Sequence, residues 1–187
     1  MALDSSEVRV AVTGAVMVGP TSTTAPTDAE ATVVGMTDLG YVAEDGVAET
    51  RERSTTKLKA WQNAATIREV VTEATISYKF KLVQTNKKTV ELYYGTTVDD
   101  ATGSLIIDPG AVGGRQAYLI DVIDGDDFIR AWIPSGEVSA VGDQVYASGE
   151  PIGYEVTITC YPDSSLTAPS GAKGSVKKFY SSLVVGP

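Results

Sequence analysis

The stretch TIREVVTEATISYKFKL, residues 66–82, alternates between two kinds of side chain over most of its length. Its apolar or small side comprises Val70, Thr72, Ala74, Ile76, Tyr78, Phe80 and Leu82, and its polar side comprises Glu69, Glu73, Ser77, Lys79 and Lys81. Successive side chains of a β-strand point to opposite faces of the sheet, so this pattern predicts a strand with one buried and one wet face.

Similar alternation predicts further strands at 8–13 and 154–160. A hairpin is predicted from 118–123 and 128–133, because the Asp124-Gly125 pair between them favours a tight turn. Pro134 should end the second of these strands or place it at a sheet edge. Shorter β-rich pieces are predicted at 104–107, 137–141 and 176–183. Gly and Pro punctuation between the pieces favours a β-sandwich or barrel, so we predict a mainly β fold.

One segment, 86–94, has helical spacing of its apolar residues, with Thr85 available as N-cap and Gly95 as the stop. A single short helix among many strands should cover an end or a face of the β structure. The Thr-, Ala- and Pro-rich segment 19–32 is predicted to be a mobile loop. At 187 residues the chain suits one domain, residues 1–187.

The composition excludes several function classes. Histidine is absent, which removes the commonest general base and transition-metal ligand. The single cysteine, Cys160, continues the apolar side of its strand and is expected to be a buried hydrophobe. Gly110–Gly114 lacks the residues of a phosphate loop, and the Asp-rich turn 121–127 lacks the Glu that closes a calcium loop. We therefore predict no enzyme activity, no catalytic or metal site and no cofactor. No apolar run is long enough to span a membrane.

Charge is distributed unevenly along the chain. The net charge of −9 opposes binding to nucleic acid through phosphate contacts. Residues 51–88 nevertheless contain nine basic and three acidic side chains, 9 − 3 = +6, so the remainder carries −9 − 6 = −15. This asymmetry has two interpretations: ordinary solvated surface charge, or complementarity between copies of the chain.

The charged segment from Tyr41 to Ala65 does not fit a compact β domain and is predicted to be a long loop. Such loops usually serve binding or stay disordered. The large aromatic Trp61 near its end favours order. It could be an interface anchor or a lid over the local core, and the sequence does not choose between the two.

Several segments together resemble the major tail protein, or tail tube protein, of bacteriophages with long non-contractile tails. The similarity rests on EVRVAVTGA at 7–15, APTD at 25–28, DLGYVAEDGV at 38–47, KAWQ at 59–62, EAT at 73–75, QTN at 84–86, LYYG at 92–95, GEPIGY at 149–154 and YPD at 161–163. It spans nearly the whole chain. Some members carry an added immunoglobulin-like domain after the tube domain, and the resemblance implies none here.

The resemblance implies a β-sandwich or barrel-like tube fold with one flanking helix, whose copies form hexameric rings that stack into a virion tail tube. It also implies that a long loop between early strands reaches a neighbouring copy. The candidate interface residues are therefore Tyr41, Glu44, Asp45, Arg51, Arg53, Lys57, Lys59 and Trp61. Implied partners are other copies of the chain and the tape-measure, tail terminator and distal tail proteins. DNA would pass through the lumen without specific binding, and Glu69 and Glu73 are the candidate lumen-facing residues.

Two other structural functions are compatible with the sequence. One is the inner-tube protein of a contractile tail or secretion machine, and the other is a monomeric β-sandwich surface-binding module. An enzyme ranks third, since its chemistry would need carboxylates, Lys or Tyr alone.

Overall fold

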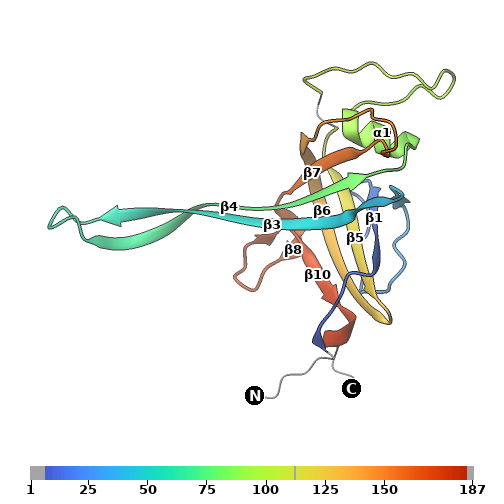
Figure 1. Ribbon diagram of the computed structural model, residues 1–187. Coiled ribbons are helices and arrows are strands. Elements are labelled where there is room, and N and C mark those ends of the chain that lie inside the picture. Colours follow the sequence, from blue (N-terminus) through green and yellow to red (C-terminus); the bar gives the residue numbers. More distant parts are fainter. Residues whose placement is uncertain (1–6, 112, 185–187) are drawn as a thin grey trace.

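The structure is a computed structural model in which residues 7–111 and 113–184 are described (Figure 1). It is mainly β, as predicted. The strands are β1 (Thr13–Gly19), β2 (Thr37–Asp38), β3 (Val42–Lys59), β4 (Thr66–Leu82), β5 (Gln116–Asp124), β6 (Asp127–Val141), β7 (Tyr154–Cys160), β8 (Asp163–Thr167), β9 (Lys173–Gly174) and β10 (Lys177–Tyr180). One helix, α1 (Lys87–Tyr94), and a final 3-10 turn, η2 (Ser181–Leu183), complete the described elements.

Eight strands form one antiparallel sheet in the order β2-β1-β5-β6-β7-β4-β3, with β10 paired to β6. Strands β8 and β9 pair separately. Side chains near both ends of this sheet, including Val16 of β1 and Phe80 of β4, belong to the same buried cluster. Strands near opposite edges of a sheet can share one core only if the sheet curls toward itself. The result is the barrel-like form in Figure 1. Cys160 is buried in this core, as predicted.

A smaller core lies on the opposite face of β5 and β6. Leu119 and Trp132 are buried there beneath the segment between β1 and β2, which contributes Val33 and Met36. Arg130 pins this segment, because its guanidinium donates to Asp121 at 2.7 and 2.8 Å and to the carbonyl of Ala31 at 2.5 Å. The predicted loop at 19–32 is irregular, but it is anchored to the sheet.

The Arg130–Asp121 pair gives a direct test of this anchoring. Both side chains are more than nine-tenths buried, at 8% and 9% exposed. Arg130→Ala should therefore lower the free energy of unfolding by about 3–5 kcal/mol, since it leaves a buried carboxylate without its cation. The double variant Arg130→Met/Asp121→Leu should recover most of this loss. Urea unfolding measures both, and equal losses in the two variants would contradict the assignment.

Pro134 neither ends its strand nor lies at a sheet edge. It is buried within β6, which runs on to Val141 and so includes the predicted piece 137–141. On one side, β6 pairs with β10 up to Trp132 and with β7 only from Gly136 onward. Pro134 falls between these two partners, where its missing N–H breaks no hydrogen bond to either strand. This position explains how a central strand tolerates proline.

Two other predicted strands are wrong. The first strand runs from Thr13 to Gly19, and Val8, Val10 and Val12 of the predicted 8–13 strand are 68%, 61% and 69% exposed. The partner strand β5 ends at Asp124, close to the start of β1, and the Val12 N–H still bonds the Ile123 carbonyl at 3.2 Å. The chain before Val12 therefore runs past the end of this ladder. Residues 104–107 form a loop in which Ile106 is 87% exposed. The piece predicted at 176–183 is divided between β10 and η2.

The helix lies at one end of the curled sheet (Figure 1), as predicted for a short helix in a β protein. Its N-cap is Asn86 and not Thr85: the Asn86 side chain accepts from the Thr89 N–H at 2.8 Å. Thr85 instead bonds the Tyr154 hydroxyl at 3.1 Å. Gly95 ends the helix with a left-handed φ of 64°, as its position predicted.

Candidate assembly interface

The most prominent feature of the molecule is a long hairpin of β3 and β4 that projects from the body (Figure 1). Inside the body, β4 has β7 as a second neighbour, and this pairing ends at Ile76 opposite Cys160. Beyond that point β3 and β4 pair only with each other, and we call residues 51–75 the outer arm. At about 3.3 Å per residue, its strands extend roughly 30 Å. The prediction of a long loop at 41–65 was wrong, because most of this segment is β-strand.

The alternating stretch 66–82 is only partly buried. Tyr78, Phe80 and Leu82 lie in the core as predicted, whereas Val70, Thr72 and Ala74 are exposed. The reason is that the apolar alternation continues past the edge of the body onto the outer arm. Leu58, Ile67 and Val71 are also exposed there, at 51%, 70% and 46%. Apolar side chains grouped on one projecting element indicate a surface that is covered by a partner.

Trp61 lies at the tip of the outer arm and is 97% exposed, so it is not a lid over the local core. The turn is closed by a hydrogen bond of 2.7 Å from the Ala60 N–H to the Ala65 carbonyl. Asn63 and Ala64 both have positive φ, 58° and 51°. Ala rarely adopts this left-handed backbone, so the tip is locally strained. A strained turn that presents a fully exposed indole is typical of a binding element.

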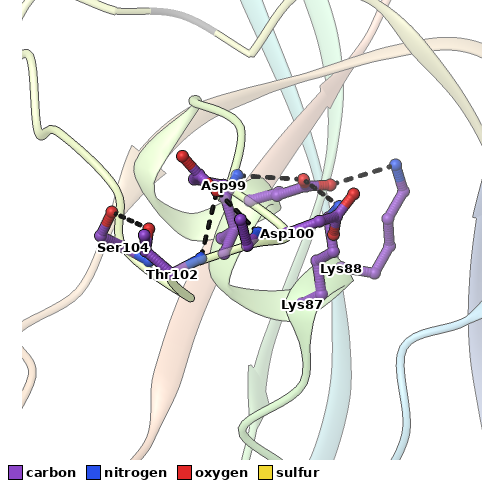
Figure 2. A network of polar contacts seen from close by, with 9 residues as sticks. Lys87, Lys88, Asp99, Asp100, Thr102 and Ser104 are labelled. Atoms are coloured by element: carbon purple, nitrogen blue, oxygen red, sulfur yellow. Dashed lines mark hydrogen bonds and ion pairs between the residues drawn. The ribbon is translucent and has the colours of Figure 1, made fainter.

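Part of the basic stretch 51–88 is neutralised within the subunit. Lys87 contacts Asp100 and lies 3.9 Å from Glu91, while Lys88 lies 3.6 Å from Glu91 (Figure 2). The same network holds the following loop, where Asp99 accepts from the Ala101 and Thr102 N–H groups. Lys79 pairs with Glu155 at 2.9 Å. The charges of these lysines are thus partly balanced within the body.

The outer arm keeps its basic residues unpaired. Among the described residues, Arg53, Lys57, Lys59 and Arg68 form no ion pair within the subunit. With Arg51 the arm has five basic residues against Glu52, Glu69 and Glu73, so 5 − 3 = +2, and the remainder of the chain carries −9 − 2 = −11. The arm and the body therefore have opposite charge.

The predicted interface residues fall into two groups, one toward each end of β3. Arg51, Arg53, Lys57, Lys59 and Trp61 belong to the outer arm. Tyr41, Glu44 and Asp45 lie at the other end of β3, beside an irregularity between Val42 and Val47 where β3 has extra residues opposite β4. All three are exposed, Tyr41 at 77%. The bulge turns these side chains away from the regular ladder.

The predicted lumen residues, Glu69 and Glu73, also lie on the outer arm. Glu69 is in register with Lys57 and accepts a 2.6 Å hydrogen bond from the Thr55 hydroxyl. Glu73 is in register with Ser54. The structure thus brings the two candidate sets together on one hairpin.

Glu49, at the root of the outer arm, was not among the predicted site residues. Its carboxylate accepts from the Tyr78 hydroxyl at 3.0 Å and contacts the Lys178 ammonium, which joins the arm to β10. Burial opposes ionisation of Glu49, but the hydrogen bonds from Lys178 and Tyr78 outweigh it and hold the pKa of Glu49 below its usual value. No local sequence signal indicates this contact, because Lys178 lies 129 residues away.

Glu49→Gln should lower stability at neutral pH by about 1–2 kcal/mol, because Lys178 loses its ionic partner. A carboxylate with a depressed folded pKa stabilises above its unfolded pKa, near 4.5, and loses this contribution as pH falls through the folded value. The difference in stability between wild type and Glu49→Gln should therefore shrink as the pH falls below 4.5. Unfolding measured at pH 7 and pH 3 tests this expectation, and a difference as large at pH 3 as at pH 7 would contradict it.

Neither a metal-binding cluster nor a membrane-spanning helix occurs among the described residues. They contain no group of three or more acidic or Cys side chains placed to hold a metal ion. Within the same part of the chain, no helix is long and apolar enough to cross a membrane. What the geometry offers is an exposed arm suited to contact with another protein.

A comparison with protein families identifies the family of this chain. A family model described as "Phage tail tube protein" matches residues 1–169. The chain belongs to the phage tail tube protein family. It is therefore a structural component of the virion tail and not an enzyme, as the sequence predicted.

Other comparisons add less about this tail tube protein. One solved structure with a similar shape is described as "Virion of native gene transfer agent (GTA) particle". It is 8% identical, with a TM-score of 0.38, over 76% of this chain and 88% of the other. A search of curated proteins gave no match.

Proposed function

We propose that the chain polymerises as stacked hexameric rings into the phage tail tube, with residues 1–187 acting as one tube-forming unit. The outer arm carries this proposal. It reaches about 30 Å from the body, and Trp61 at its tip is 97% exposed. Such a surface needs a partner, and in a self-assembling tail protein the simplest partner is another copy.

The arm also explains how a ring and a tube could both form. A surface patch that fits a different patch on the next copy makes a head-to-tail contact, which closes into rings or extends as filaments according to its rotation. The opposite charges of arm and body favour such a contact and fix its register. Contacts at the two ends of the tube would be made by the tape-measure, tail terminator and distal tail proteins.

The tube would serve as the conduit for DNA ejection into the host. A wall that neutralised phosphates would bind DNA and slow it, whereas an acidic wall repels the backbone. The surplus of −11 outside the arm is consistent with this function. Glu69 and Glu73 remain the candidates for the lumen wall, which requires one side of the arm to face the channel.

Electron microscopy of the purified protein at high concentration tests the proposal. We expect uniform hollow tubes with sixfold rings. Solid fibres, or rings of another symmetry, would contradict the hexameric tube. A tail isolated from virions that lacked this chain would contradict the function as a whole.

A further inference from the structure

A cavity of about 660 Å³ lies between β1 and the start of β3, where the curled sheet does not close. Residues 11–16 line one side, and residues 40–44 with Gly46 and Val47 line much of the other. We call this cavity the seam. Its volume lies in the range of protein sites that hold a bound group the size of a large side chain or more.

The strand edges along the seam lack partners. β3 is the last strand of the sheet, so it pairs with β4 on one side only. β1 pairs with β2 at Met17 and Val18, which leaves the residues from Thr13 to Ala15 bare on that edge. Unpaired edges are available for hydrogen bonding to another chain.

The seam is also acidic. Asp38, Glu44 and Asp121 are among its lining residues, and no Lys or Arg lines it. Asp121 is already paired with Arg130. Among the described side chains, Asp38, Glu44 and the adjacent Asp45 form no ion pair. Tyr41 adds an exposed aromatic ring beside them.

We infer that the seam of one copy receives the tip of the outer arm of another copy, with Trp61 entering the cavity and Lys57 and Lys59 facing Glu44 and Asp45. This inference rests on the proposed function and names the receiving surface. The fit is one of charge and chemistry: an unpaired basic tip with an exposed indole meets an unpaired acidic cavity with an exposed tyrosine.

The arm cannot reach the seam of its own subunit. Both features lie on β3, with the seam at Val42–Val47 and the tip beyond Lys59. From Val47 to Lys59 an extended strand covers roughly 40 Å. The contact must then join two copies, and because two different surfaces meet, it is head-to-tail and can propagate along a tube.

A second cavity, of about 430 Å³, lies beside α1 and is lined by Leu92, Tyr93, Ile107 and Asp108 among others. One carboxylate lines this cavity, that of Asp108. The end of β6 is the part of the main sheet that borders it. The seam offers more unpaired carboxylates and two bare edges, so the α1 cavity serves as the alternative in the test.

Disulfide trapping in assembled tubes distinguishes the two cavities. We expect Gln62→Cys/Glu44→Cys to form covalent multimers on oxidation, and Gln62→Cys/Ile107→Cys to remain monomeric under denaturing electrophoresis. Cys160 is 4% exposed and should not react in either variant. Tubes in which only the Ile107 pair, or neither pair, is trapped would overturn the inference while leaving the tube function intact.

Charge exchange gives an independent test. Lys57→Glu/Lys59→Glu and Glu44→Lys/Asp45→Lys should each raise the concentration needed for assembly at least about tenfold. Combining all four changes should restore it to within about threefold of wild type, since the opposite charges meet again. No recovery in the combined variant would contradict the inference. Failure of the wild type itself to form tubes would instead contradict the proposed function and the inference together.

Discussion

Removal of most of the outer arm should leave a stable monomer that forms no tube. Arg53 and Ala74 are paired in register, so residues 54–73 can be replaced by Asn-Gly, a two-residue turn suited to directly paired strands. We expect the free energy of unfolding to change by about 1 kcal/mol or less, because the deleted segment is a two-stranded hairpin that adds little stability by itself. Sedimentation should detect no polymer at concentrations where the wild type assembles.

The matched control for this deletion keeps the arm and alters only its turn. Ala64→Gly relieves the positive φ at the tip without removing Trp61 or any charge. It should assemble like the wild type. Tubes of normal length from the truncated protein would show that the arm is not the assembly element.

Reversal of charge near the root of the outer arm should have the second largest effect. Arg51→Glu/Arg53→Glu turns two arm cations into anions while both side chains stay exposed, so the monomer should remain folded. We expect the concentration needed for assembly to rise at least about tenfold, which corresponds to roughly 1.4 kcal/mol for each subunit added to the tube. The conservative variant Arg51→Lys/Arg53→Lys keeps both positive charges and should raise this concentration much less.

The control for net charge reverses two exposed lysines of the body, Lys173→Glu/Lys177→Glu. It changes the charge of the chain by the same amount as the arm variant. If assembly depends on the arm and not on total charge, this variant should assemble nearly normally. Equal impairment in the two double variants would show general repulsion between copies.

Much of the fold followed from local patterns in the sequence. The hairpin of β5 and β6, the strand β7 and the helix ending at Gly95 were predicted because alternation, an Asp-Gly turn and a left-handed glycine act over a few residues. Pro134 was misplaced because its tolerance depends on where β6 changes partners, which is a property of the whole sheet. The strand at 8–13 failed because alternation does not show whether a partner strand extends far enough.

In the candidate site, too, local features could be predicted and contacts between distant segments could not. The segment 41–65 and Trp61 were recognised as exceptional, but the first was read as a loop, since strand alternation in β3 is obscured by charged residues that are exposed on both faces. Both faces are exposed because no other part of the subunit packs against the arm. No local sequence pattern predicts that a hairpin projects from the body. The Glu49–Lys178 contact and the seam depend on chain segments far apart in sequence, so neither could be predicted locally.

A reconstruction of the assembled tail at side-chain resolution tests the central claim most directly. We predict six copies of this chain per ring around a hollow channel, with the outer arm of each copy buried against a neighbour and Trp61 no longer exposed. Rings in which the arms point into solvent and touch no other copy would contradict the account.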